Sequence, residues 1–190
     1  GQGADPAQDE VGLTAPLRGP AAPARALLLL AALLAASPAA PGRQEAGAKP
    51  SEAHRRWLEE EVAWIIAPAE REVFSRLTTD RERDLFIEAF WKQRDPTPDD
   101  GRNEFRIEHE RRLAHADRAL GRDAPRPGRR TDRGRVYIIL GEPREVQRFE
   151  GKAQTYDVEV WFYQGLTGLG LPPAFNVVFF RDSSRGEYRL

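Results

Sequence analysis

The spacing of apolar residues changes part-way along this chain, and that change limits the fold more than any other feature. From Ser51 to Leu120 apolar residues recur every three or four positions, as on one face of a helix. From Arg135 onward they form short continuous runs, which are typical of strands. Helices followed by strands predict an α+β fold, with about four N-terminal helices packed on a small antiparallel sheet of three or four strands.

The helical part contains recognisable starts and stops. Ser51 is placed to cap a first helix, and Pro68 ends that helix and opens the next. Thr79 is placed to cap a third helix. The segment 94–101 holds two prolines and a glycine, so it breaks the pattern before a fourth helix over about 102–120.

Three apolar runs predict the strands: 135–140 (RVYIIL), 158–163 (VEVWFY) and 175–180 (FNVVFF). The first run is apolar on both faces, so we expect it at the centre of the sheet. Residues 187–190 could add a fourth strand. Short connections favour antiparallel pairing, because a parallel return needs a crossover of about a dozen residues.

The first 47 residues differ from the rest in composition and are expected to form a disordered leader. Within it, segment 25–40 joins Arg25 to an Ala/Leu run and then to small residues, which is typical of a secretory signal. The alternative is a short Ala/Leu helix in a low-complexity leader. We therefore expect one folded domain over 48–190 in an exported product. The run falls short of the roughly 20 residues that a membrane span needs, so no transmembrane anchor is expected.

The composition excludes several function classes. The chain has no cysteine, which removes disulfides, thiolate metal sites and the lipid anchor of a bacterial lipoprotein. Its 29 Lys and Arg residues and 30 Asp and Glu residues leave a net charge of -1. That charge provides no electrostatic reason to expect a nucleic-acid partner.

No pattern of catalytic or cofactor-binding residues assembles in the sequence. His109 and His115 lack the spacing of a zinc-protease helix, and His109 falls on an apolar stripe typical of a core histidine. The glycines of 165–170 lack the Lys-Ser/Thr of a phosphate-binding loop. We therefore expect no metal, no cofactor and no assigned catalytic residue. A carboxylate pair such as Asp132 and Glu142 is the alternative source of acid–base chemistry.

Two stretches together resemble the GWxTD domain family of exported bacterial proteins. The first is FWKQRDPTP over 90–98, which is followed by Asn103-Glu104-Phe105. The second is GRRTDRGRVYI over 128–138, in which Arg129 stands at the position of the family's tryptophan, followed by Gly141-Glu142-Pro143. The resemblance spans roughly 57–190 and implies an exported bacterial domain without an established biochemical role.

The motif residues allow a structural and a functional interpretation. In the first, Gly128 permits a turn, Thr131 and Asp132 bond its amides, and Gly134 releases the chain into a strand. In the second, one cleft at the helix–sheet junction binds a ligand. The residues of that candidate cleft are Arg94, Asp95, Thr131, Asp132, Arg133 and Trp161.

The sequence therefore favours a non-enzymatic interaction or structural module of the cell envelope, with a protein or envelope partner. Trp161, Tyr163 and Phe180 occupy strand positions that can face outward and meet that partner. The alternative is a metal-independent hydrolase or glycan-active enzyme that uses carboxylates of the two motifs. Proximity of Asp95, Asp132 and Glu142 would favour this alternative.

Overall fold

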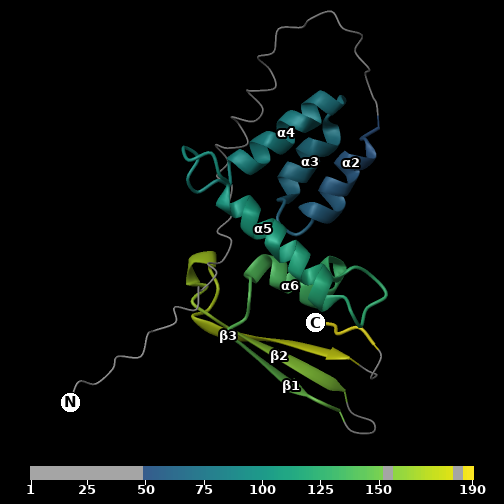
Figure 1. Cartoon of the computed structure of the whole chain (residues 1–190), viewed down its shortest axis with the longest axis vertical. Coiled ribbons are helices and arrows are strands. Elements are labelled where there is room, and N and C mark those ends of the chain that lie inside the picture. Colours follow the sequence, from purple (N-terminus) through teal and green to yellow (C-terminus); the bar gives the residue numbers. More distant parts are fainter. Residues whose placement is uncertain (1–48, 152–155, 182–185) are drawn as a thin grey trace, which may run out of the picture.

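The structure is a computed structural model, and it describes residues 49–151, 156–181 and 186–190. The expected leader and its signal-like segment lie outside the described residues. The helices precede a three-stranded antiparallel sheet, which confirms the α+β expectation (Figure 1). The α-helices are α2 (Glu52–Arg56), α3 (Pro68–Arg76), α4 (Asp80–Lys92), α5 (Glu104–His115) and α6 (Asp132–Leu140). Short helical turns are η1 (Trp57–Glu61), η2 (Ala116–Leu120), η3 (Gly128–Arg130) and η4 (Thr167–Leu169), and the strands are β1 (Glu145–Phe149), β2 (Asp157–Gln164) and β3 (Ala174–Arg181).

The helix starts follow the capping residues. The Ser51 hydroxyl accepts a hydrogen bond from the backbone N–H of His54, and Thr79 and Glu82 form a reciprocal capping box at α4. Asn103 caps α5 through the N–H of Arg106. The predicted break over 94–101 and the fourth helix up to 120 are both confirmed.

α2, α3 and α4 pack on one another and on the start of α5, at the end of the molecule away from the sheet (Figure 1). Aromatic rings dominate this helical core: the Trp57 ring lies 5.2 Å from the ring centroids of both Phe74 and Phe90. The buried members of the core are Trp57, Val62, Ile66, Phe74, Phe86, Phe90, Trp91 and Phe105.

The prediction of a central strand over 135–140 is wrong: these residues form most of α6. Thr131 caps the helix, and the guanidinium of Arg112 bonds the carbonyls of Ile138 and Ile139 at its C-terminal end. α6 lies between the helical core and the sheet, so its side chains are apolar on most sides. A short run that is apolar all round has the same composition in a buried helix and in a central strand.

The sheet has the order β1-β2-β3, with both neighbouring pairs antiparallel. The predicted strands over 158–163 and 175–180 are confirmed as parts of β2 and β3. β1 was not predicted, because its sequence EVQRF is polar and all five residues are exposed. The final segment contributes a single bridge between Arg189 and Phe180.

α6 and η2 cover one face of the sheet, and a second core lies between them (Figure 1). Its buried members are Val136, Tyr137, Trp161, Tyr163, Leu166, Phe179 and Tyr188. A small cluster of Leu113, Ala116 and Ile138 joins the two cores, since Ile65 packs on it from the helical side and Leu120 from the sheet side.

Candidate functional site

The Arg-Asp-Pro motif follows α4, and its arginine bonds entirely within the helical half. Arg94 Nη2 donates to the two carboxylate oxygens of Glu70 at 2.8 and 2.7 Å. Its Nη1 donates to the carbonyl of Phe90, and the guanidinium carbon lies 3.6 Å from the Phe90 ring centroid. Arg94 and Glu70 are both buried, so the pair ties the end of α4 to the first turn of α3.

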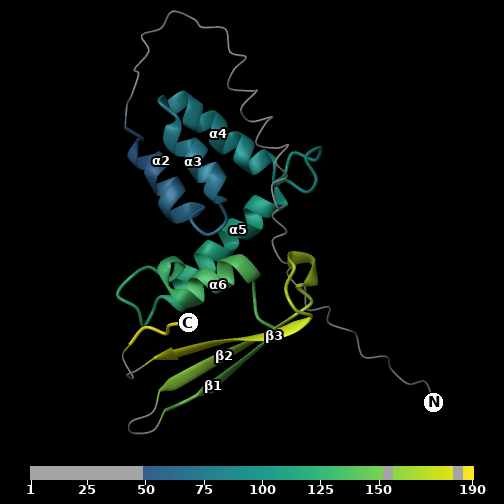
Figure 2. The same ribbon diagram turned by 180° about the vertical axis from the view of Figure 1, so that it is seen from behind.

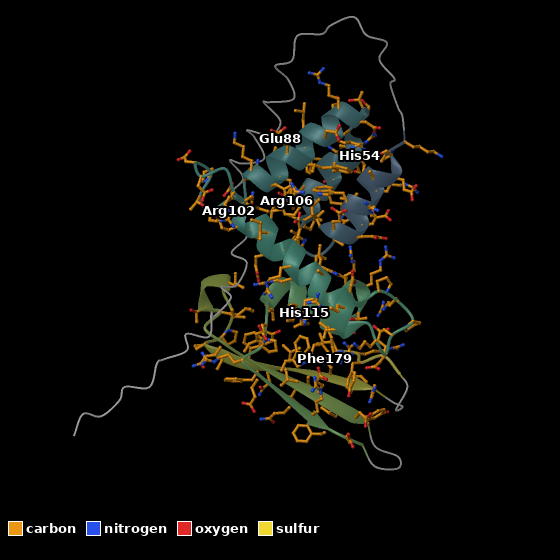
Figure 3. All side chains as sticks on the ribbon, viewed as in Figure 1. His54, Glu88, Arg102, Arg106, His115 and Phe179 are labelled. Carbon is orange, nitrogen blue, oxygen red and sulfur yellow. The ribbon has the colours of Figure 1, made fainter. Side chains whose placement is uncertain are left out.

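An open groove of about 480 Å³ runs beside this motif. Asp95 and Asn103 line it, and Asn103 Nδ2 also donates to the carbonyl of Trp91 at 2.8 Å. Glu88 on α4 and Arg106 on α5 flank it (Figure 3). The rim carries both charge signs, through Asp84, Glu88, Asp95, Lys92 and Arg106. Both parts of the first motif thus meet at one surface.

The Thr-Asp motif builds a junction of three backbone segments. Thr131 Oγ1 donates to the carbonyl of Gly128 at 2.8 Å and accepts from the N–H of Gly134 at 2.9 Å. A Cβ on Gly134 would lie 1.8 Å from the Gly128 oxygen, and one on Gly128 would lie 1.8 Å from the Ala116 oxygen. These two glycines are therefore required by close backbone contact among η2, η3 and α6.

Asp132 occupies the first turn of α6 and contacts the final segment. Its Oδ2 accepts from the backbone N–H of Leu190 at 3.0 Å, and its Oδ1 lies 3.7 Å from Arg135. A carboxylate at this position also interacts favourably with the helix dipole. From the sequence Asp132 is expected to bond the amides of the turn, whereas in the structure its carboxylate bonds the N–H of Leu190.

Arg129, at the position of the family's tryptophan, bonds Asp117 of η2. Its backbone N–H and its Nε donate to the Asp117 carboxylate at 2.9 and 2.7 Å. The carbonyl of Arg129 accepts from the indole of Trp64 at 2.8 Å. The ion pair therefore holds η3 on η2, and the indole of Trp64 links η3 to the helical core.

Glu159 is a buried carboxylate that the sequence does not single out as a site residue. Arg133 Nη1 and Arg148 Nε donate to its Oε2 at 3.3 and 2.9 Å, and the Trp161 indole donates to its Oε1 at 2.6 Å. The Tyr188 ring lies 4.5 Å from the Arg133 guanidinium carbon. The one signal in the sequence is a glutamate inside an apolar run, but only the strand pairing shows that it faces inward.

The histidines occupy three different environments. His109 is buried, its Nε2 bonds the carbonyl of Glu61 at 2.6 Å, and burial lowers its pKa to about 4. The prediction of a core histidine is therefore confirmed. His54 lies between Ser51 and Asp84, each 2.8 Å from one ring nitrogen. His115 stacks on Tyr137 at 4.3 Å, and burial lowers its pKa.

The six residues of the candidate cleft fall into two groups. Arg133 and Trp161 both donate to the carboxylate of Glu159. Thr131 and Asp132 stand at the start of α6, the helix that carries Arg133. Arg94 and Asp95 belong to the helical half, and Asp95 there bonds the N–H of Thr97. α5 separates α4 from α6 in both views (Figures 1 and 2).

The carboxylates of the enzymatic alternative are spread along the fold. Asp132 begins the nine-residue α6 and Glu142 follows its end, so the length of the helix, about 13 Å, lies between their backbone positions. Asp95 lies beyond α5 in the helical half. Within the described residues, no side chain forms a hydrogen bond or ion pair with more than one of Asp95, Asp132 and Glu142.

The sheet has a filled inner face and an open outer face. The expectation that Trp161 and Tyr163 face outward is wrong: each is only 2% exposed, on the face toward α6, because their positions alternate with the outer ones. Phe179 shares that inner face (Figure 3), whereas Phe180 is 42% exposed on the outer face. Cross-strand pairing places Phe180 beside Val158 and Val158 beside Phe149.

Among the described residues, no cluster of His, Asp and Glu side chains is arranged to hold a metal ion. None of the helices in that part of the chain combines the length and hydropathy that crossing a bilayer requires. A family model described as the GWxTD domain matches residues 45–182. Comparison with curated proteins and with solved structures gives no match.

Proposed function

This chain belongs to the GWxTD domain family, and we propose that it is a non-enzymatic interaction module of the bacterial cell envelope that binds a protein partner. The proposed binding surface is the outer face of the sheet, which no described helix covers. The motif residues support this proposal because their contacts hold the fold together. Arg94 and Arg133 are both committed to buried carboxylates, and Thr131 is committed to the cap of α6.

One observation carries the proposal: large apolar side chains gather on the outer face. Phe149, Val178 and Phe180 are between 42% and 55% exposed, and Tyr156 packs its ring edge-on against Phe180 at 5.8 Å. Val158 lies between Phe149 and Phe180 in the register, so the rings belong to one continuous patch. Contiguous exposed apolar patches of this kind mark interaction sites on soluble proteins.

The outer face also has the anatomy of a protein interface. Glu145, Gln147 and Asn176 occupy the same face toward its other end, and they provide polar groups beside the aromatic patch. An aromatic centre with a polar margin is typical of protein–protein contacts. A polymer-cleaving site would instead need convergent acid and base groups, and this face presents only one carboxylate, Glu145, in its strand positions.

The test compares two aspartate variants of the full chain in affinity capture from the envelope fraction. Val178→Asp places a charge in the patch, whereas Ile107→Asp places the same charge on an exposed isoleucine of α5. We expect one protein to be captured by the unmodified chain and by Ile107→Asp, and lost with Val178→Asp. Thermal unfolding of both variants checks that each remains folded.

Two results would contradict this function. The first is capture that both variants retain equally, because the outer face would then be irrelevant. The second is hydrolysis of an envelope polymer by the unmodified chain that Asp132→Ala abolishes while the variant stays folded. That result would favour the enzymatic alternative.

Export is part of the proposal and is supported by the signal-like sequence of segment 25–40. Expression in a bacterial host followed by N-terminal sequencing of the periplasmic product tests it. We expect a new N-terminus near Ala39. A full-length product in the cytoplasmic fraction alone would contradict export.

A further inference from the structure

The free edge of the sheet is formed by β1, and its sequence is complementary to itself. β2 is the only strand that pairs with β1 in the described part of the chain. All five β1 residues are exposed, and so are Arg144 and Glu150 on either side. An unpaired strand edge is a template for pairing with another chain.

We propose that two copies of this chain pair antiparallel through β1, in a register centred on Gln147. That register aligns the whole of β1 with itself, so Gln147 meets Gln147 of the second copy. Arg144 then lies opposite Glu150 of the second copy, and Glu150 opposite its Arg144. Among the ion pairs of the described residues, none involves Arg144 or Glu150, and both side chains are exposed at the edge.

Charge also selects this register over its neighbours. A two-fold axis perpendicular to the sheet keeps the faces matched, so the register can only shift by two residues at a time. A shift in one direction places Arg144 opposite Arg148 of the second copy. A shift in the other direction places Arg148 opposite Arg148. Like charges directly opposite each other disfavour pairing, whereas the centred register has two attractive pairs.

The fold leaves room for the second copy at this edge. β1 is the strand farthest from the helices in both views (Figures 1 and 2). Val146 lies on the inner face opposite Trp161, yet it is 37% exposed, so α6 does not extend over β1. Two sheets joined in this way form one six-stranded sheet, with both apolar outer faces on the same side. Because the contact is small, we expect a reversible dimer whose population rises with protein concentration.

The absence of cysteine from the chain permits a direct test of the register. Directly opposite residues in antiparallel strands have Cα atoms about 4.5 to 5.5 Å apart, within the range that a disulfide spans. Under mild oxidation the full-length Gln147→Cys variant is expected to form a covalent dimer. Glu145→Cys and Phe149→Cys alone are matched controls, because each would lie about 13 Å from its own copy along the strand. A mixture of these two variants is expected to cross-link, since residue 145 faces residue 149 of the second copy.

Charge reversal provides the second arm. By sedimentation equilibrium, Arg144→Glu and Glu150→Arg are each expected to weaken the dimer roughly tenfold, because two attractive pairs become repulsive. The double variant restores both pairs and is expected to dimerise like the unmodified chain. Thermal unfolding of the variants checks that folding is intact.

Several results would overturn the proposal. These are equal cross-linking of all three single cysteine variants, no cross-linking of Gln147→Cys, or a double charge variant as weak as the single ones. Loss of the dimer with Val178→Asp, while the charge variants have no effect, would place the contact on the outer face instead. The inference does not rest on the proposed function, because capture of a partner by the outer face and pairing of β1 are measured separately.

Discussion

At the scale of single residues, the arginines of the two motifs stabilise the fold through buried ion pairs. Arg94 and Glu70 form a buried ion pair with two hydrogen bonds, and the arginine also packs on the ring of Phe90. Breaking a buried pair costs far more than breaking a surface one, because the remaining charge stays buried without a partner. The motif arginine is therefore expected to matter for folding before it matters for binding.

Arg94→Ala leaves the carboxylate of Glu70 buried without its guanidinium. We expect the free energy of unfolding to fall by about 3 to 5 kcal/mol. Urea denaturation followed by circular dichroism measures this loss. Arg102→Ala, at an exposed loop position, is the control and should change stability by less than about 0.5 kcal/mol. Equal losses of unfolding free energy in the two variants would contradict a stabilising role for the Arg94–Glu70 pair.

His109 should make the folded state sensitive to acid. Burial first, and then the nearby charge of Arg112, lower its pKa to about 4 from a usual value near 6.5. The folded state therefore binds fewer protons than the unfolded state between these values. Stability from this group is present above pH 6.5 and is lost as the pH falls toward 4, by up to about 3 kcal/mol.

Denaturant unfolding of the unmodified chain and of His109→Gln, over the range pH 7 to 4, tests this sign. The glutamine can still donate to the Glu61 carbonyl but does not titrate. We expect the variant to lose less stability than the unmodified chain as the pH falls. Parallel pH curves for the two proteins would contradict the assignment.

At the scale of elements, α6 and the turn before it form the best-defined unit of the motif. Thr131 caps the helix, and Gly128 and Gly134 let the backbones of η2, η3 and α6 touch. The spaced glycines of the motif therefore serve close packing. Helix propensity and packing make opposite predictions for Gly134, and that opposition allows a clear test.

Alanine in place of glycine inside a helix normally raises stability by up to about 1 kcal/mol. At Gly134 the added Cβ would overlap a backbone oxygen, so we expect Gly134→Ala to lower stability by about 1 to 3 kcal/mol. Thermal unfolding measures the sign directly. Gly101→Ala is the comparison, because its Cβ meets no atom and its positive φ costs only about 1 kcal/mol. A stabilised Gly134→Ala variant would show that the backbones do not touch.

At the scale of the whole molecule, two cores meet at one small cluster. The helical core and the sheet core are joined through Leu113, Ala116 and Ile138. Ile138 comes from α6 and is completely buried, whereas its neighbour Ile139 is 38% exposed. We infer that the cluster makes the two halves unfold together.

Ile138→Ala should open a cavity at this junction and lower stability by about 2 to 4 kcal/mol. It should also separate the unfolding of the two halves, since little else in the apolar interior links them. Hydrogen exchange of α4 and of β2 measures the separation, with Ile139→Ala as the matched control that keeps the halves coupled. Two halves that remain equally protected in Ile138→Ala would contradict the inference.

Most helix boundaries were predictable from sequence because capping and proline act within one turn. Ser51 and Thr79 define helix starts through bonds to nearby backbone N–H groups, and Pro68 opens α3 at its first position because its φ is fixed. The candidate cleft was less predictable, since its members were grouped by motif alone. Arg94 bonds a residue 24 positions away and Arg133 one 26 positions away, and no local pattern indicates such partners.

The family, the α+β class, the helix caps and two of the three strands follow from the amino-acid sequence alone. Those features depend on local hydrogen bonding and on the order of apolar runs. The helix over 135–140, the inward orientation of Trp161 and Tyr163, and the edge strand EVQRF depend on tertiary contacts. An apolar run fits any buried environment, whether helix or strand. Which environment it occupies depends on contacts between segments far apart in the chain.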